Sequence, residues 1–117
     1  MIVEAALDLS VLVGDWRNTN PAAGIGRIVV EPSSGGGVTV HVTSSTRDWG
    51  KVDAPVFAFE FDSDKAGAFL AVYDFDFEEV RLQVNVKLGV LVVASFNQFK
   101  DDSGRSSYFN REFFYRV

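Results

Sequence analysis

Strict alternation of apolar and polar residues is the feature that most constrains how this chain can fold. The clearest example is VRLQVNVKL, residues 80–88, in which every second residue is aliphatic and those between are polar. A period of two residues is typical of a β-strand with one buried face. Other stretches share this texture, and short segments rich in Gly, Ser and Asp separate them. They are Gly26–Pro32, Val38–Ser45, Val56–Phe61, Ala68–Phe77, Val90–Lys100 and Tyr108–Val117.

The segments between these strands are too short for crossover helices, so the strands are expected to pair antiparallel. A further short strand around Trp16 brings the total to about eight. Closure of such a meander into a barrel removes its exposed edges. The sequence therefore predicts an all-β fold, an antiparallel up-and-down β-barrel of about eight strands. A single domain spans residues 1–117, and a short helical turn is expected within Val3–Leu12.

Composition excludes several classes of function. The 117 residues carry a net charge of −5, which argues against a nucleic-acid binder and against an anionic membrane surface. The chain has no cysteine, so it has neither disulfides nor a thiolate zinc site. No apolar run approaches the length of a membrane span, and the N-terminus lacks a basic region typical of a signal peptide. We expect a cytoplasmic protein without cofactor or metal, although a mature secreted form would look similar.

One short motif suggests a family. Gly14-Asp15-Trp16 resembles the Gly-x-Trp on the first strand of the calycin superfamily, which includes lipocalins, fatty-acid-binding proteins and avidin-type proteins. In lipocalins this tryptophan plugs the closed end of the barrel, and a basic residue of the last strand packs across its ring. The resemblance implies that Trp16 is such a plug and that Arg111 covers it, with Arg116 as the second choice. The chain is shorter than a lipocalin and lacks its cysteines, so the resemblance implies no particular ligand.

Two polar candidates have alternative interpretations. His41 lies at the surface if Val38, Val40 and Val42 point inward, and in a cavity with acid–base potential if they point outward. The acidic run of residues 74–79 could provide oxygen ligands for calcium, but it lacks the glycine and spacing of a dedicated loop. We expect it to be a solvated outer face.

The second tryptophan, Trp49, falls in the segment TRDWGKVDAP, residues 46–55, which breaks the alternation. We interpret this segment as a long connection. There Trp49 either forms a lid over a pocket or packs against the barrel wall or a neighbouring subunit.

Aromatic residues are too numerous for all of them to fit inside a barrel of this size. Those that the alternation could place inward are Phe57, Phe59, Phe61, Phe69, Tyr73, Phe75, Phe96, Phe113 and Tyr115. Some must therefore face outward. An apolar outer wall around Leu70, Val72, Leu91 and Val93 would form a partner surface, so we expect a homodimer.

The leading functional hypothesis is a binding protein with an aromatic-lined cavity for a small hydrophobic molecule. The candidate ligand-binding residues are His41, Trp49, Phe59, Tyr73, Phe75, Phe96, Asn97 and Tyr115. One alternative is a cofactor-free cyclase or isomerase that folds a hydrophobic metabolite inside the barrel. The other is a structural or interaction protein whose barrel is filled by side chains.

Overall fold

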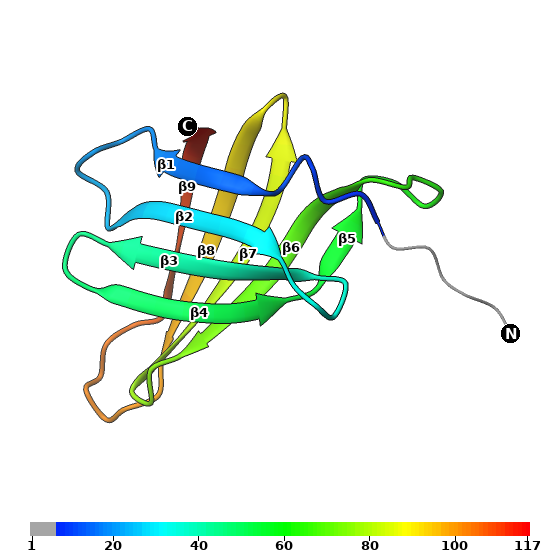
Figure 1. Cartoon of the computed structure of the whole chain (residues 1–117). Coiled ribbons are helices and arrows are strands. Elements are labelled where there is room, and N and C mark those ends of the chain that lie inside the picture. The colour runs from blue at the N-terminus through cyan, green and yellow to red at the C-terminus, as the bar shows by residue number, and fades with distance from the viewer. Residues whose placement is uncertain (1–6) are drawn as a thin grey trace, which may run out of the picture.

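The barrel is built from one antiparallel sheet of nine strands. The computed structural model describes residues 7–117, and the sheet in it rolls into a nearly closed barrel (Figure 1). Strands β1 to β4 form one layer, and β6 to β9 form a second layer that crosses behind the first. The strand order is β4-β3-β2-β1-β9-β8-β7-β6-β5. The strands are β1 (Gly14–Asn18), β2 (Ile25–Pro32), β3 (Val38–Ser44), β4 (Asp48–Ala54), β5 (Val56–Ala58), β6 (Ala66–Asp74), β7 (Glu78–Lys87), β8 (Val90–Phe99) and β9 (Tyr108–Arg116).

The predicted class, an antiparallel all-β barrel, is confirmed, but two segments differ from the prediction. The expected connection around Trp49 is an edge strand, β4, which pairs with β3 and brings the strand number to nine. Its alternation is hidden in the sequence because Gly50, with φ of 84°, follows a bulge in the pairing. The expected strand over Val56–Phe61 is shorter, since pairing with β6 ends at a bulge next to Ala58.

The predicted N-terminal helical turn is not a helix in the part of the chain that the structure describes. Residues 7–13 form a single tight turn, in which the Leu9 carbonyl accepts hydrogen bonds from the amides of Leu12 and Val13. Asp8 makes an isolated bridge to Lys65, so this segment lies across one end of the barrel. The rest of the prediction, over residues 3–6, lies outside the described residues. Nothing in residues 7–117 forms a helix with the length and hydropathy of a membrane crossing.

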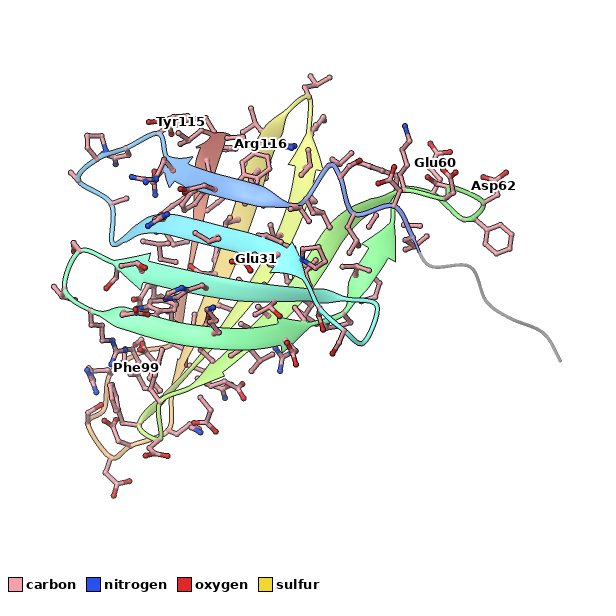
Figure 2. All side chains as sticks on the ribbon, viewed as in Figure 1. Glu31, Glu60, Asp62, Phe99, Tyr115 and Arg116 are labelled. Carbon is pink, nitrogen blue, oxygen red and sulfur yellow. The ribbon has the colours of Figure 1, made fainter. Side chains whose placement is uncertain are left out.

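Burial on β7 follows the alternation of its sequence, with aliphatic residues inside and polar residues outside. On β8 the predicted faces were wrong: Leu91 and Val93 are buried in the core rather than on the outer wall. Both faces of β8 are apolar over these positions, so alternation alone could not assign the inner one. Phe96, Phe113 and Tyr115, which the alternation could have placed inward, are exposed on the outer face. Tyr115 is labelled in Figure 2.

The barrel has a seam where β4 approaches β6, which it contacts without forming a ladder in the described chain. At one end of the seam Pro55 links β4 directly to β5, and its carbonyl accepts a 3.4 Å hydrogen bond from the Leu70 amide. At the other end side chains close the gap. The Tyr73 hydroxyl lies 2.9 Å from the Gly50 carbonyl oxygen and 3.1 Å from that of Val40. The two ends of the seam are therefore closed by different means.

Candidate functional site

The end of the barrel beneath the N-terminal segment is closed by Trp16. Its ring is fully buried, and its indole Nε1 donates a 2.9 Å hydrogen bond to the Leu12 carbonyl. The guanidinium of Arg116 lies 4.7 Å from the ring centroid, which is a cation–π contact. The same guanidinium donates hydrogen bonds to the carbonyl oxygens of Ser10, at 3.1 Å, and Val11, at 2.7 Å. Arg116 thus ties the N-terminal segment to the last strand.

The prediction that Arg111 covers Trp16 was wrong, and the second choice, Arg116, occupies that position. The reason is that side chains along β9 alternate between the inner and the outer face of the sheet. Phe114 points into the core, so Arg116 lies on the same side, whereas Arg111 is on the opposite, outer side. Gly14 makes the arrangement possible, because a Cβ there would lie 3.0 Å from Cδ of Arg116. The Gly-x-Trp motif therefore leaves space for the arginine.

The opposite end of the barrel is open and contains a cleft of about 370 Å³. Its wall is formed by the start of β2, the β3–β4 turn, the end of β8 and the start of β9. The lining residues are Gly24, Ile25, Ser44, Ser45, Thr46, Arg47, Trp49, Ser95, Asn97, Tyr108, Asn110 and Glu112. The cleft is predominantly polar, in contrast to the aliphatic core beside it.

Asn97 is the most unusual residue of the cleft. The residue is only 8% exposed and its amide makes no hydrogen bond within residues 7–117, but the amide atoms still reach the solvent of the cleft. An amide offers two donor hydrogens and one acceptor oxygen, and groups of this kind are normally paired when they are buried. Ser95, two residues earlier on the same inner face, makes a single long contact of 3.5 Å to the Asn110 carbonyl. The floor of the cleft therefore has hydrogen-bonding capacity that the described protein does not use.

Asn18 provides an internal comparison because it is equally buried, with 9% of its surface exposed. Its Nδ2 donates to the Ile25 carbonyl at 2.8 Å and to Glu112 Oε2 at 2.6 Å, and its Oδ1 accepts from the Asn20 amide. The other oxygen of Glu112 accepts a 2.8 Å hydrogen bond from Asn110. The carboxylate at the rim of the cleft is thus held in a defined orientation.

An aromatic cluster forms the wall beside the seam. Trp49 packs edge-on against both Tyr73 and Phe75, with ring centroids 5.4 Å apart in each case. The Arg47 guanidinium lies 4.1 Å from the centroid of Phe75. Burial raises the pKa of Tyr73 to about 12, so its hydroxyl remains protonated and available as a donor at neutral pH. This cluster positions the Trp49 ring at the edge of the cleft.

The structure brings together four of the eight predicted ligand-binding residues. Trp49 and Asn97 line the cleft, and Tyr73 and Phe75 pack behind Trp49. The other four lie elsewhere. His41 is on the outer face, where its Nε2 is 2.7 Å from Asp48 Oδ1. Phe59 packs on Gly67 at the closed end, and Phe96 and Tyr115 are on the outer face.

Sequence reasoning missed Ser95 and Glu112, and a signal for the first was present. The inward positions of β8 read Leu91, Val93, Ser95 and Asn97, so the aliphatic run becomes polar halfway along the strand. Such a switch on a buried face indicates a polar site. Glu112 could not be found in this way, because its role depends on Asn18 from a strand distant in sequence.

The acidic run of residues 74–79 lies outside the cleft. Asp74 makes a 2.7 Å ion pair with Lys100, whose hydrogen bond lowers the pKa of the Asp74 carboxyl, and Asp76 adopts a φ of 70° in the turn. No three His, Cys, Asp or Glu side chains within residues 7–117 are arranged to hold a metal ion.

The chain was compared with protein-family models, with curated proteins and with solved structures. Protein-family models, curated proteins and solved structures yielded no match to the chain.

Proposed function

We propose that this protein is a small calycin-like barrel that binds one small organic molecule in the cleft at its open end. The observation that carries the proposal is Asn97, a mostly buried residue whose amide reaches the cleft and makes no hydrogen bond within residues 7–117. Because these amide atoms reach the cleft, solvent satisfies them in the free protein, and a bound ligand would replace that solvent. A polar group held at the floor of a cleft and not used by the fold is suited to ligand recognition.

The lining of the cleft suggests the chemistry of the ligand. Asn97 would pair with a group that both donates and accepts hydrogen bonds, such as an amide or a lactam. The edge of the Trp49 ring would contact an apolar planar part of the same molecule. Glu112 would accept a hydrogen bond from a donor near the rim. A purely hydrophobic ligand would leave Asn97 unpaired, so we propose a planar molecule that is apolar on its faces and polar along one edge.

The size of the cleft supports a small ligand. A volume of about 370 Å³ lies near the lower end of the range for small-molecule sites, about 300–1,000 Å³. Aliphatic side chains fill the barrel interior beyond the cleft, including Val40, Val42, Leu82 and Val93. The ligand would therefore bind at the mouth rather than deep inside the barrel.

A fragment screen monitored by amide chemical shifts tests this proposal. The probes are planar amides such as benzamide and nicotinamide, with benzene and naphthalene as matched compounds that cannot form hydrogen bonds. We expect the amides to shift resonances of residues 44–50, 95–97 and 110–112, and to do so more strongly than the hydrocarbons.

Asn97→Leu should weaken amide binding at least tenfold, about 1.4 kcal/mol, because it removes the hydrogen-bonding edge. Asn85→Leu, at an exposed position of β7, is the matched control and should leave binding unchanged. Equal binding of amides and hydrocarbons, or shifts confined to other surfaces, would contradict the proposal. In that case the filled-barrel interpretation would be favoured.

A further inference from the structure

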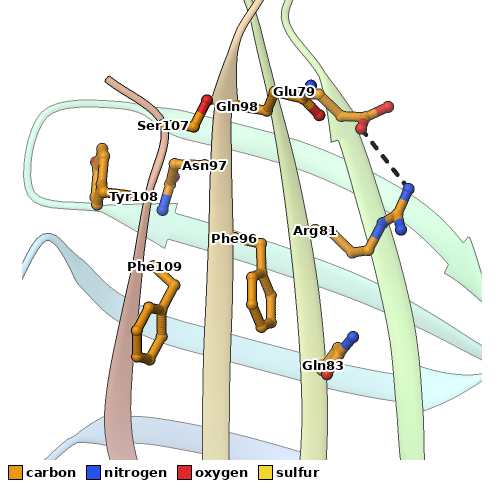
Figure 3. Close-up of a pocket in the computed structure, with 9 residues that line it drawn as sticks. All are labelled: Glu79, Arg81, Gln83, Phe96, Asn97, Gln98, Ser107, Tyr108 and Phe109. Atoms are coloured by element: carbon orange, nitrogen blue, oxygen red, sulfur yellow. Dashed lines mark ion pairs between the residues drawn. The ribbon is translucent and has the colours of Figure 1, made fainter. Parts of the chain in front are cut away.

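The outer face of the second layer presents an unusual set of aromatic side chains to solvent. We call Phe57, Phe96, Phe109, Phe113 and Tyr115, on β5, β8 and β9, the outer aromatic face. Their exposed fractions range from 42% for Phe96 to 63% for Phe109. Phe96 and Phe109 stack on neighbouring strands with centroids 5.8 Å apart (Figure 3). Two shallow grooves of about 510 and 610 Å³ lie beside these rings.

The area of this face equals that of the largest apolar patch on an ordinary monomer. An aromatic side chain carries about 150–250 Å², so five that are half exposed present about 500 Å². The largest apolar patch on an ordinary monomer is about 300–600 Å², and it is often functional. Leu70, Val92 and Ala94 add aliphatic surface to the same grooves. These aliphatic residues and the polar side chains between the rings would have to supply the remainder of the roughly 800 Å² per partner of a standard protein interface.

We propose that the outer aromatic face is where two copies of this chain pack together as a symmetric dimer. In such a dimer each copy contributes the same surface, so a single patch meets its own image across a two-fold axis. Two sheet faces that pack in this way keep their strands within about 30° of each other. The interface is expected to resemble the core of a β-sandwich.

We place the two-fold axis along one row of paired residues on the outer face. Ala94 is paired with Gln83 on one side and Arg111 on the other, so these three residues form a row across the sheet. Phe109 lies two residues before this row on β9, and Phe113 lies two residues after it. An axis that follows the row therefore sets Phe109 of one copy opposite the partner's Phe113.

The charges at the two ends of β7 agree with this axis. Glu79 and Lys87 are both outward-facing and lie four residues to either side of Gln83. The axis sets Glu79 opposite the partner's Lys87, and the symmetry makes this pair twice. Arg111 lies on the axis and therefore faces the partner's Arg111, and stacking of its planar guanidinium against the rings of Phe109 and Phe113 would have to offset this like-charge contact.

This proposal is independent of ligand binding, because the cleft opens on the inner side of the sheet. The first experiment is sedimentation velocity on the full chain over a wide range of concentration. We expect a monomer–dimer equilibrium with a mass of two chains at high concentration. A monomer at every concentration would overturn the proposal.

Substitutions locate the interface. Phe109→Ser should produce a monomer, whereas Phe61→Ser, at a fully exposed position outside the face, should not change the association. Circular dichroism confirms that both variants remain folded. A dimer that Phe109→Ser leaves intact would show that another surface is used and would overturn the assignment.

Charge reversal tests the axis. Glu79→Lys and Lys87→Glu should each weaken the dimer about tenfold, because each converts two attractive pairs into repulsive ones. The double variant Glu79→Lys with Lys87→Glu should restore the association, since it recreates both pairs. Failure of the double variant to recover would overturn the two-fold arrangement.

Discussion

The two ends of the barrel use the same sheet in opposite ways. At the closed end Trp16 is buried with its indole nitrogen paired, and Arg116 covers its ring while donating hydrogen bonds to three carbonyl oxygens. At the open end Trp49 is half-buried, and Asn97 retains an unpaired amide among the described residues. An end whose polar groups are hydrogen-bonded within the protein contributes stability. An end with free hydrogen-bonding groups can instead recognise a ligand. We therefore expect substitutions at the closed end to affect mainly the stability of the fold, and substitutions at the open end to affect mainly ligand recognition.

The largest expected effect is at the closed end. Trp16→Ala should reduce the free energy of unfolding by about 3–5 kcal/mol, because it leaves a large cavity in the core. Trp49→Ala should cost about half as much, since that side chain is only partly buried. Urea denaturation followed by circular dichroism measures both variants. An equal or greater loss for Trp49→Ala would mean that the closed end is not the more important one for stability.

A pair of equally buried asparagines sharpens the comparison within the open end. Asn18→Leu should cost about 2–3 kcal/mol, because it leaves the Ile25 carbonyl and the Glu112 carboxylate without their donor. Asn97→Leu should change stability by less than about 0.5 kcal/mol, because it breaks no hydrogen bond with residues 7–117. Thermal and urea unfolding of the two variants provide the test. Similar losses would indicate that Asn97 has a structural role.

Alkaline pH should weaken the side-chain closure of the seam. Tyr73 has a pKa of about 12 in the folded protein, whereas an unfolded tyrosine titrates near its ordinary value of about 10. The contribution of the neutral Tyr73 side chain to the free energy of unfolding is therefore complete below pH 10 and is lost as pH rises toward 12. We expect a decrease of about 2 kcal/mol across this range, after allowance for solvent screening near the mouth. Tyr73→Phe should lack this component, and identical pH profiles for the two proteins would contradict it.

The smallest effect distinguishes two arginines of β9. Arg116→Met should cost about 1–2 kcal/mol, since it removes the cation–π contact and the hydrogen bonds to Ser10 and Val11. Arg111→Met, on the outer face, should have little effect in dilute protein. Differential scanning fluorimetry compares their melting temperatures. A greater loss for Arg111→Met would restore the original assignment of the residue that stabilises the plug.

Much of the fold was predictable because alternation directly encodes a buried face. The pattern of residues 80–88 predicted both the strand β7 and its inner face. Alternation did not reveal the strand β4, where Gly50 and a bulge interrupt the period. It also did not identify the inner face of β8, where aliphatic residues occupy both faces. The exposed aromatics of β9 were assigned inward because hydrophobicity alone does not distinguish a core from a partner surface.

The candidate site was less accessible to sequence analysis. Trp49 and Asn97 were identified, but Glu112 enters the cleft only through the pairing of distant strands, and Arg47, two residues before Trp49 in the β3–β4 turn, was not considered. Arg116 was ranked second to Arg111, because the choice depends on Phe114 being the inward residue of β9, which the sequence did not reveal. Local pattern therefore predicts which face a side chain occupies better than which residues meet across the barrel.

The pairing of β1 with β9 has a consequence for how the chain folds. Trp16 pairs with Arg116 across a span of about a hundred residues, whereas the other ladders join strands that are neighbours in sequence. Closing so long a loop has a high entropic cost and is slow compared with forming hairpins. The β1–β4 and β6–β9 meanders are therefore expected to form first, and the joint between them limits the rate. Stopped-flow refolding of Arg116→Met should then be slower than that of the wild type, so the residue that holds the plug would also set the time needed to complete the barrel.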